Sequence, residues 1–167
     1  MRFTLLAFIF LLTNTLQVQA SVQTCFQKEG FLSQTAHSTA LKQWIKRRPP
    51  DPSFYKLERA YAFSYYESGL VNRLFKYDKA KHCLVGCRIA QDIDFETAEY
   101  AAWYKEYTDL IDCNSKSKFE TLDYVFTLWG AYRGTESQDF LYCVEKCEMI
   151  TKTKSTIRTF NNQKSKP

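Results

Sequence analysis

The sequence predicts an all-α fold, a compact bundle of about five to six helices stapled by three disulfides. Glycine and proline are scarce, at 5 and 4 of 167 residues, whereas aromatic residues reach 16%, a composition that disfavours a disordered chain or a turn-rich β fold. Helix start and stop signals recur at helical spacing. Cys83-x3-Cys87 and Cys143-x3-Cys147 share one spacing, which places each pair on one face of a helix.

The N-terminus has the pattern of a cleavable export signal. Arg2 supplies a basic start, residues 5–12 form an apolar run, and Ala20 is a small residue at the expected cleavage point. Because a bilayer-spanning helix needs about 20 residues, this run predicts no stable membrane insertion. We expect a secreted or periplasmic protein. The predicted parts are a signal peptide (1–20), a single helical disulfide-bonded domain (21–150) and a basic flexible tail (151–167).

The net charge of +5 does not belong to the predicted domain. Residues 21–150 carry 17 Lys and Arg against 18 Asp and Glu, a net of −1, because six basic residues lie in the signal and the tail. Binding to nucleic acid depends on clustered positive charge, so no nucleic acid is expected as a partner. A short basic terminus of this kind is usually solvated.

Caps and breakers mark the first two helices of the domain. Ser33 is the expected N-cap of a helix over residues 34–47, and His37 in its polar start is expected to be exposed. A second helix opens at Asp51-Pro52 and ends before Gly69. Its many Tyr and Phe residues predict core packing, with an apolar ligand cavity as the alternative.

Four further helices follow from similar signals. Asp94 is an expected N-cap, and Ser117-Lys118-Phe119-Glu120 has the pattern of a capping box that starts a helix at Lys118. An apolar stripe of that helix is expected to face the core, at Phe119, Leu122, Val125, Phe126, Trp129 and Tyr132. The four helices are expected at residues 78–93, 95–110, 118–134 and 137–151.

The cysteine spacing also predicts connectivity. If the two helices with paired cysteines are antiparallel, the outer cysteines of each pair face one another, and so do the inner ones. The predicted bonds are Cys83–Cys147, Cys87–Cys143 and, by elimination, Cys25–Cys113. His82 beside Cys83 offers zinc-ligand types, but adjacent residues point to different sides of a helix, so neither a metal nor another cofactor is expected.

Polar residues on three of the expected helices form a candidate catalytic set. His82, Glu106, Asp109 and Asp123 converge if those helices are neighbours, and a histidine oriented by carboxylates suits general acid–base chemistry. Lys105 stands four residues before Asp109 and can hold its carboxylate. The alternative is structural, since a lone histidine near acidic helix faces is more often structural or exposed.

A glycine in the same region suggests a close contact. Gly130 lies inside an expected helix, where glycine costs about 1 kcal/mol relative to alanine. Such a residue usually marks the close approach of another backbone or of a ligand.

Three motifs of this region resemble a helical module of exported bacterial proteins and toxin-associated C-terminal regions. They are Lys81-His82-Cys83-x3-Cys87, Lys105-Glu106-x2-Asp109 and Asp123-x2-Phe126-Thr127-x2-Gly130. The module has Ala and Asn where this chain has Phe126 and Thr127. The resemblance covers residues 81–130 and implies an exported helical protein, without a reaction type.

Two functional hypotheses follow. The first is an exported, disulfide-stabilised binding or interaction module for an unknown protein or a small apolar ligand. The alternative is a small secreted hydrolase-like or toxin-type enzyme that uses His82 with the nearby carboxylates. An aromatic groove or a protein-facing patch without convergent polar groups favours the first hypothesis. A histidine within hydrogen-bond reach of carboxylates in an accessible site favours the second.

Overall fold

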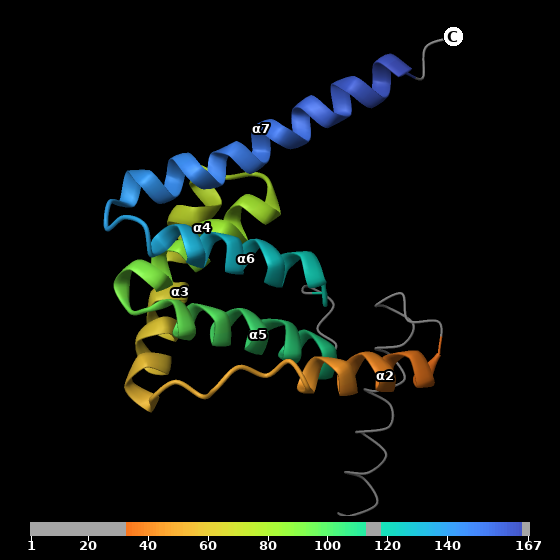
Figure 1. Cartoon of the computed structure of the whole chain (residues 1–167), viewed down its shortest axis with the longest axis vertical. Coiled ribbons are helices and arrows are strands. Elements are labelled where there is room, and N and C mark those ends of the chain that lie inside the picture. The colour runs from red at the N-terminus through yellow and green to blue at the C-terminus, as the bar shows by residue number, and fades with distance from the viewer. Residues whose placement is uncertain (1–32, 113–117, 165–167) are drawn as a thin grey trace, which may run out of the picture. The chain divides into compact units, whose positions relative to one another are not determined.

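The computed structural model describes residues 33–112 and 118–164, and its regular elements there are all helices (Figure 1). The predicted all-α class is confirmed for this part of the chain. The helices are α2 (Gln34–Ile45), α3 (Phe54–Leu74), α4 (Asp78–Asp92), α5 (Phe95–Asp112), α6 (Thr121–Gly134) and α7 (Phe140–Lys164).

The chain forms two compact units. Among the described residues, unit 1 comprises 33–47, 105–112 and 118–119, and unit 2 comprises 48–104 and 120–164. Unit 1 therefore contains α2 and the C-terminal part of α5. Unit 2 contains α3, α4, α6, α7 and the beginning of α5.

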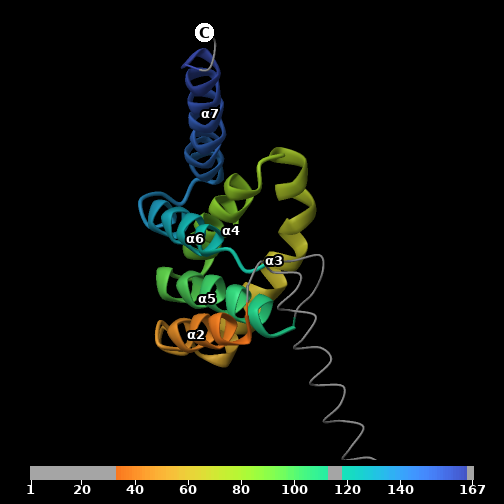
Figure 2. The ribbon, with the colours of Figure 1, turned by 90° about the vertical axis from the view of Figure 1, so that its right-hand side faces the viewer.

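Helix α4 is the centre of unit 2, because α3, α6 and α7 each pack against it (Figures 1 and 2). Most of its side chains are buried. One core cluster joins α4 to α7 and to the end of α3, through Val71, Phe75, Ala80, Cys83, Leu84, Cys87, Cys143 and Cys147. A second cluster surrounds the other end of α4, at Ala60, Ile89, Ala90, Ala98 and Ala131.

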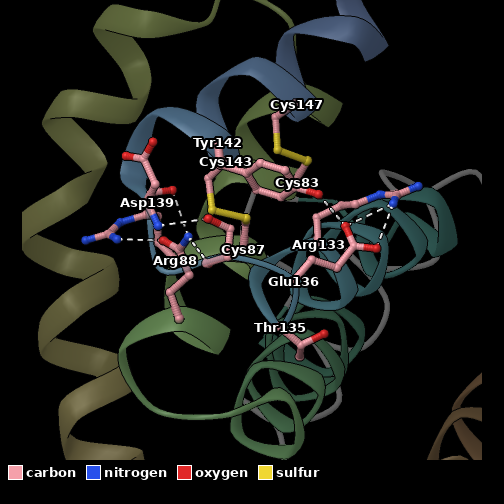
Figure 3. The surroundings of a disulfide bond; sticks show 12 residues. Cys83, Cys87, Arg88, Arg133, Thr135, Glu136, Asp139, Tyr142, Cys143 and Cys147 are labelled. Atoms are coloured by element: carbon pink, nitrogen blue, oxygen red, sulfur yellow. Dashed lines mark hydrogen bonds and ion pairs between the residues drawn. A yellow bond between two sulfur atoms is a disulfide. The ribbon is translucent and has the colours of Figure 1, made fainter.

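Two disulfides join α4 to α7 (Figure 3). Cys83 pairs with Cys147 and Cys87 with Cys143, with Cα–Cα separations of 5.6 and 5.8 Å. These are the pairs that the antiparallel arrangement predicts. Because they close loops with sequence separations of 64 and 56 residues, each restricts the unfolded chain strongly. The predicted Cys25–Cys113 bond lies outside the described residues.

Glycines allow α4 and α6 to touch through their backbones. A Cβ built on Gly130 would overlap the carbonyl oxygen of Cys83, and one built on Gly86 would overlap the carbonyl oxygen of Thr127. The close approach expected at Gly130 is therefore observed, and it involves another backbone. Cys83 thus faces α7 with its sulfur and α6 with its carbonyl group.

The capping predictions have different outcomes. The Ser33 hydroxyl accepts a hydrogen bond from the Ala36 amide at 3.2 Å, and Asp94 Oδ1 accepts one from the Thr97 amide at 2.8 Å, as expected of N-caps. The predicted start of α6 is wrong. The helix begins at Thr121, and the Glu120 side chain binds Lys79 and caps no amide.

Helices α3 and α7 are longer than expected. Helix α3 continues past Gly69 to Leu74, because an internal glycine lowers helix stability without breaking the hydrogen-bond ladder. Helix α7 starts at Phe140 and its backbone continues to Lys164, into the segment predicted as a basic flexible tail. None of the helices in the described ranges is both long and apolar enough to cross a membrane.

Helix α6 turns a different face to the core than expected. Of its predicted apolar stripe, Leu122, Val125 and Tyr132 are exposed. The residues it buries are small or polar, namely Asp123, Thr127, Gly130, Ala131 and Gly134. The backbone contact with α4 requires small residues on the shared face, and this requirement outweighs the burial of the larger apolar side chains.

Candidate functional site

A buried lysine gathers three carboxylates at the N-terminal ends of α4 and α6. The Lys79 side chain is 9% exposed, and its Nζ lies 3.2 Å from Asp78 Oδ2. The same ammonium donates hydrogen bonds to the carboxylates of Glu120 and Asp123. Together with His82, these residues form what we call the Lys79 cluster.

The ion pairs of this cluster outweigh the cost of burial. Burial by itself would raise the pKa of Asp123, but hydrogen bonds from His82 and Lys79 and their charges hold this pKa below its usual range. Burial would lower the pKa of Lys79, but its bonds to Asp123, Glu120 and Asp78 raise it. Both side chains are therefore charged at neutral pH. The Asp123 carboxylate is only 6% exposed, so it depends on these partners.

His82 contacts the Lys79 cluster through one ring nitrogen and Thr127 through the other. Its Nε2 lies 3.3 Å from Asp123 Oδ2 and 3.8 Å from Asp78 Oδ2. Its Nδ1 lies 3.5 Å from Thr127 Oγ1, while that hydroxyl donates its proton to the Asp123 carbonyl oxygen at 2.7 Å. The hydroxyl can therefore only accept from Nδ1. Both ring nitrogens are directed at protein groups, which is typical of a histidine that fixes two helices together.

Donor atoms of a possible metal site occur in the same place. One ligand atom from each of Asp78, His82 and Asp123 lies within 4.8 Å of the others. The ammonium of Lys79 already binds the two carboxylates of this set, those of Asp78 and Asp123. It therefore occupies the position where a metal ion would bind. A divalent ion would have to displace a buried, charged lysine, so the residues do not fit a metal centre well.

The other two predicted catalytic residues belong to unit 1. Glu106 and Asp109 are both buried, and Lys105 Nζ lies 3.2 Å from Glu106 Oε1 and also donates to Asp109 Oδ2. The predicted Lys105–Asp109 contact is therefore present. The structure brings His82 and Asp123 together within unit 2. The convergence of all four residues stays a prediction.

His37, the second histidine, is also in unit 1. It is buried, and its Nε2 lies 2.8 Å from the carbonyl oxygen of Leu110, so this nitrogen donates a hydrogen bond. The expectation of an exposed His37 is wrong, because the ring links α2 to the end of α5.

The aromatic residues of α3 have a different environment from the one predicted. Val71 and Ala60 face the core, whereas five aromatic side chains are 65–83% exposed. We call these five the α3 aromatic face: Phe54, Tyr55, Tyr61, Tyr65 and Tyr66. They neither fill the core nor line an internal cavity, so both interpretations of this segment are wrong for these positions.

The α3 aromatic face is held on a fixed helix. Arg59 Nη2 lies 2.8 Å from Asp92 Oδ2 at the end of α4, and Lys56 Nζ lies 2.6 Å from Asp94 Oδ2. The rings of Tyr65 and Tyr66 contact each other edge to face, with centroids 5.7 Å apart. The aromatic rings are therefore presented by an anchored helix.

Sequence reasoning missed Lys79 and the exposure of α3. A lysine inside a helix is usually exposed, so only the acidic residues around it could have drawn attention to it. For α3 the signal was available, because Phe54, Tyr61 and Tyr65 share one side of a helix and Ala60 and Val71 share a different side. The chain matches no protein family, no curated protein and no solved structure.

Proposed function

We propose that this protein is an exported interaction module that binds another polypeptide through the α3 aromatic face. The observation that carries the proposal is the exposure of five aromatic side chains on one helix, each at 65% or more. The disulfides between α4 and α7 support export, because such bonds persist in oxidising compartments.

The size of the surface supports a macromolecular partner. Aromatic side chains offer about 150–250 Å² each, so the α3 aromatic face exposes on the order of 700 Å². One side of a standard protein interface covers about 800 Å². The largest apolar patch of a typical monomer covers about 300–600 Å² and is itself often functional.

The chemistry of the face favours a polypeptide. Four of the five residues are tyrosines, which are enriched at protein interfaces because each ring offers apolar area and a hydroxyl hydrogen-bonding group. The anchoring pairs Arg59–Asp92 and Lys56–Asp94 reduce the entropy that binding must remove from α3.

Site-specific photo-crosslinking tests the proposal. A benzophenone amino acid is introduced at Tyr61 or Tyr66 in the full chain, expressed in the cells that export it, and at Leu141 as a matched control. Leu141 is 68% exposed on α7, outside the α3 aromatic face. We expect a discrete polypeptide adduct, identified by mass spectrometry, from the α3 positions alone. Adduct levels at α3 no higher than at Leu141 would overturn the proposal.

A second candidate function rests on the 3.3 Å contact between His82 Nε2 and Asp123 Oδ2. An imidazole oriented by a carboxylate can transfer protons, which supports the hydrolase-type alternative. Hydrolysis of nitrophenyl esters, phosphates and glycosides is the direct test. Activity that His82→Gln removes while the melting temperature stays constant would support this candidate. A loss of thermal stability without any activity to lose would contradict it.

A further inference from the structure

We infer that the partner of the α3 aromatic face is a second copy of this chain, with the two α3 helices antiparallel and centred between Tyr65 and Tyr66. The inference rests on the proposed function of this face and adds the identity of the partner. It follows from three features of α3: an exposed glycine, a stripe on which small and aromatic residues recur at helical spacing, and opposite charges at matching distances from the centre.

The Gly69 position is open within one chain. A Cβ built on it meets nothing within 4 Å, in contrast to the close backbone contacts of Gly86 and Gly130. Glycine inside a helix costs about 1 kcal/mol relative to alanine. A helix of a partner that packs closely against α3 at this point accounts for the missing side chain.

The residues around Gly69 form a stripe suited to helix pairing. Positions along the stripe alternate by three and four residues, as in helices that pack along their length. The stripe is Tyr55, Glu58, Ala62, Tyr65 and Gly69. All of these residues are exposed except Ala62, which is half-buried. The small residues Ala62 and Gly69 lie on either side of Tyr65 along the stripe, so a partner's backbone can approach next to that ring.

One antiparallel register satisfies both the small residues and the charges. Around a two-fold axis between Tyr65 and Tyr66, Ala62 lies opposite Gly69 of the second copy, because both are equally far from the axis. Small residues at this contact permit a separation near the lower end of the usual 8–10 Å between helix axes. In the same register Glu58 lies opposite Arg73 of the second copy.

The charged residues are available for this contact. Glu58 and Arg73 are both exposed, and neither takes part in a salt bridge within the described part of the chain. The two-fold symmetry forms each Glu58–Arg73 pair twice, as an isologous interface requires. With about 700 Å² from each copy, the buried total falls within the range of about 1,200–2,000 Å² for stable interfaces.

A charge-swap experiment tests the register. The secreted chain, Glu58→Arg, Arg73→Glu and an equal mixture of the two variants are compared by sedimentation equilibrium. We expect a dimer for the unchanged chain. Each single variant should dimerise about ten-fold more weakly or worse, because two attractive pairs become repulsive. The mixture should regain the dimer, because both pairs have opposite charges in the mixed species.

A size change at Gly69 provides an independent check. Gly69→Leu should fold, since Gly69 is exposed and a Cβ at this position meets nothing within 4 Å, and should abolish the dimer by holding the helices apart. Glu145→Leu, at a position of α7 whose side chain is 70% exposed, is the matched control and should remain dimeric.

The possible results separate the dimer from the proposed function. A monomeric unchanged chain that still gives adducts with a different polypeptide at Tyr61 would overturn the dimer and keep the interaction module. A dimer that the charge variants leave intact, or that the mixture fails to restore, would overturn the α3 register. A monomeric chain without adducts at α3 would overturn both.

Discussion

Alanine substitution of two helix-interior glycines should have opposite effects on stability. Gly69→Ala places a methyl group in open space and should stabilise the fold by about 1 kcal/mol, the difference in helix propensity. Gly130→Ala gains the same propensity, but its methyl group would overlap the Cys83 carbonyl oxygen. Overpacking typically costs about 1–3 kcal/mol and occasionally more.

The contact at Gly130 should reach the upper end of that range. Its neighbour is a backbone carbonyl group, and the disulfide to Cys147 limits how far the Cys83 backbone can move. We therefore expect a net loss of about 2 kcal/mol or more for Gly130→Ala, against a gain of about 1 kcal/mol for Gly69→Ala.

Denaturation of the oxidised protein measures both effects. The variants are compared by urea unfolding and by thermal melting, at dilutions where the melting temperature no longer depends on concentration, so that association does not contribute. A gain of 1 kcal/mol raises the melting temperature of a chain of this size by about 2–4 °C. Equal stability of the two variants, with unchanged denaturant slopes, would refute the backbone contact between α4 and α6.

Three further substitutions test other parts of unit 2. Replacing both Cys87 and Cys143 by alanine should lower the free energy of unfolding by about 2–4 kcal/mol, measured by urea denaturation, and most of the loss should vanish when both proteins are fully reduced. Lys79→Met should cost about 3–5 kcal/mol at neutral pH, because it leaves the buried Asp123 carboxylate without its cation. The pKa of Asp123 is lower in the folded protein than in the unfolded chain, where it is about 3.9. The Asp123 carboxylate therefore stabilises the fold fully above about pH 3.9, and this stabilisation is lost as the pH falls through the lowered pKa of the folded state. The loss of stability in Lys79→Met, relative to the unchanged chain, should therefore become smaller below about pH 4 when melting temperatures are measured over a pH series. A loss that stays constant with pH would contradict the role of Lys79 as the cation of Asp123. Asp94→Ala should cost about 1 kcal/mol, because the Thr97 amide loses its cap, whereas Asp94→Asn should retain most of the stability.

The features that the sequence predicts well depend on few residues. A cap needs one side chain and an amide three residues away, so Ser33 and Asp94 could be identified directly. The cysteine spacing fixed the register of α4 and α7 because two i, i+4 pairs on antiparallel helices match in one arrangement only. These signals are local, or are carried by covalent bonds.

The orientation of α6 could not be predicted from apolar periodicity. That method assumes that the largest apolar residues are buried, but α6 meets α4 along Thr127 and Gly130, where the backbones touch. Burial of Asp123 depends on Lys79, a residue of another helix whose position no local pattern reveals. The sequence pattern assigned Glu120 to a capping box, but in the structure its carboxylate binds Lys79.

The arrangement around α4 also indicates that the α3 aromatic face contributes little to folding. Helix α4 is joined to α7 by disulfides and to α6 by backbone contact, while α3 contributes Ala60 and Val71 to the core clusters. The rings of Tyr61 and Tyr65 are exposed and bury little area within the chain. Their contribution to folding is therefore small, and exposed apolar area is itself a risk of aggregation. A surface that contributes little to the fold and carries such a risk supports the proposed binding function, because association would bury it.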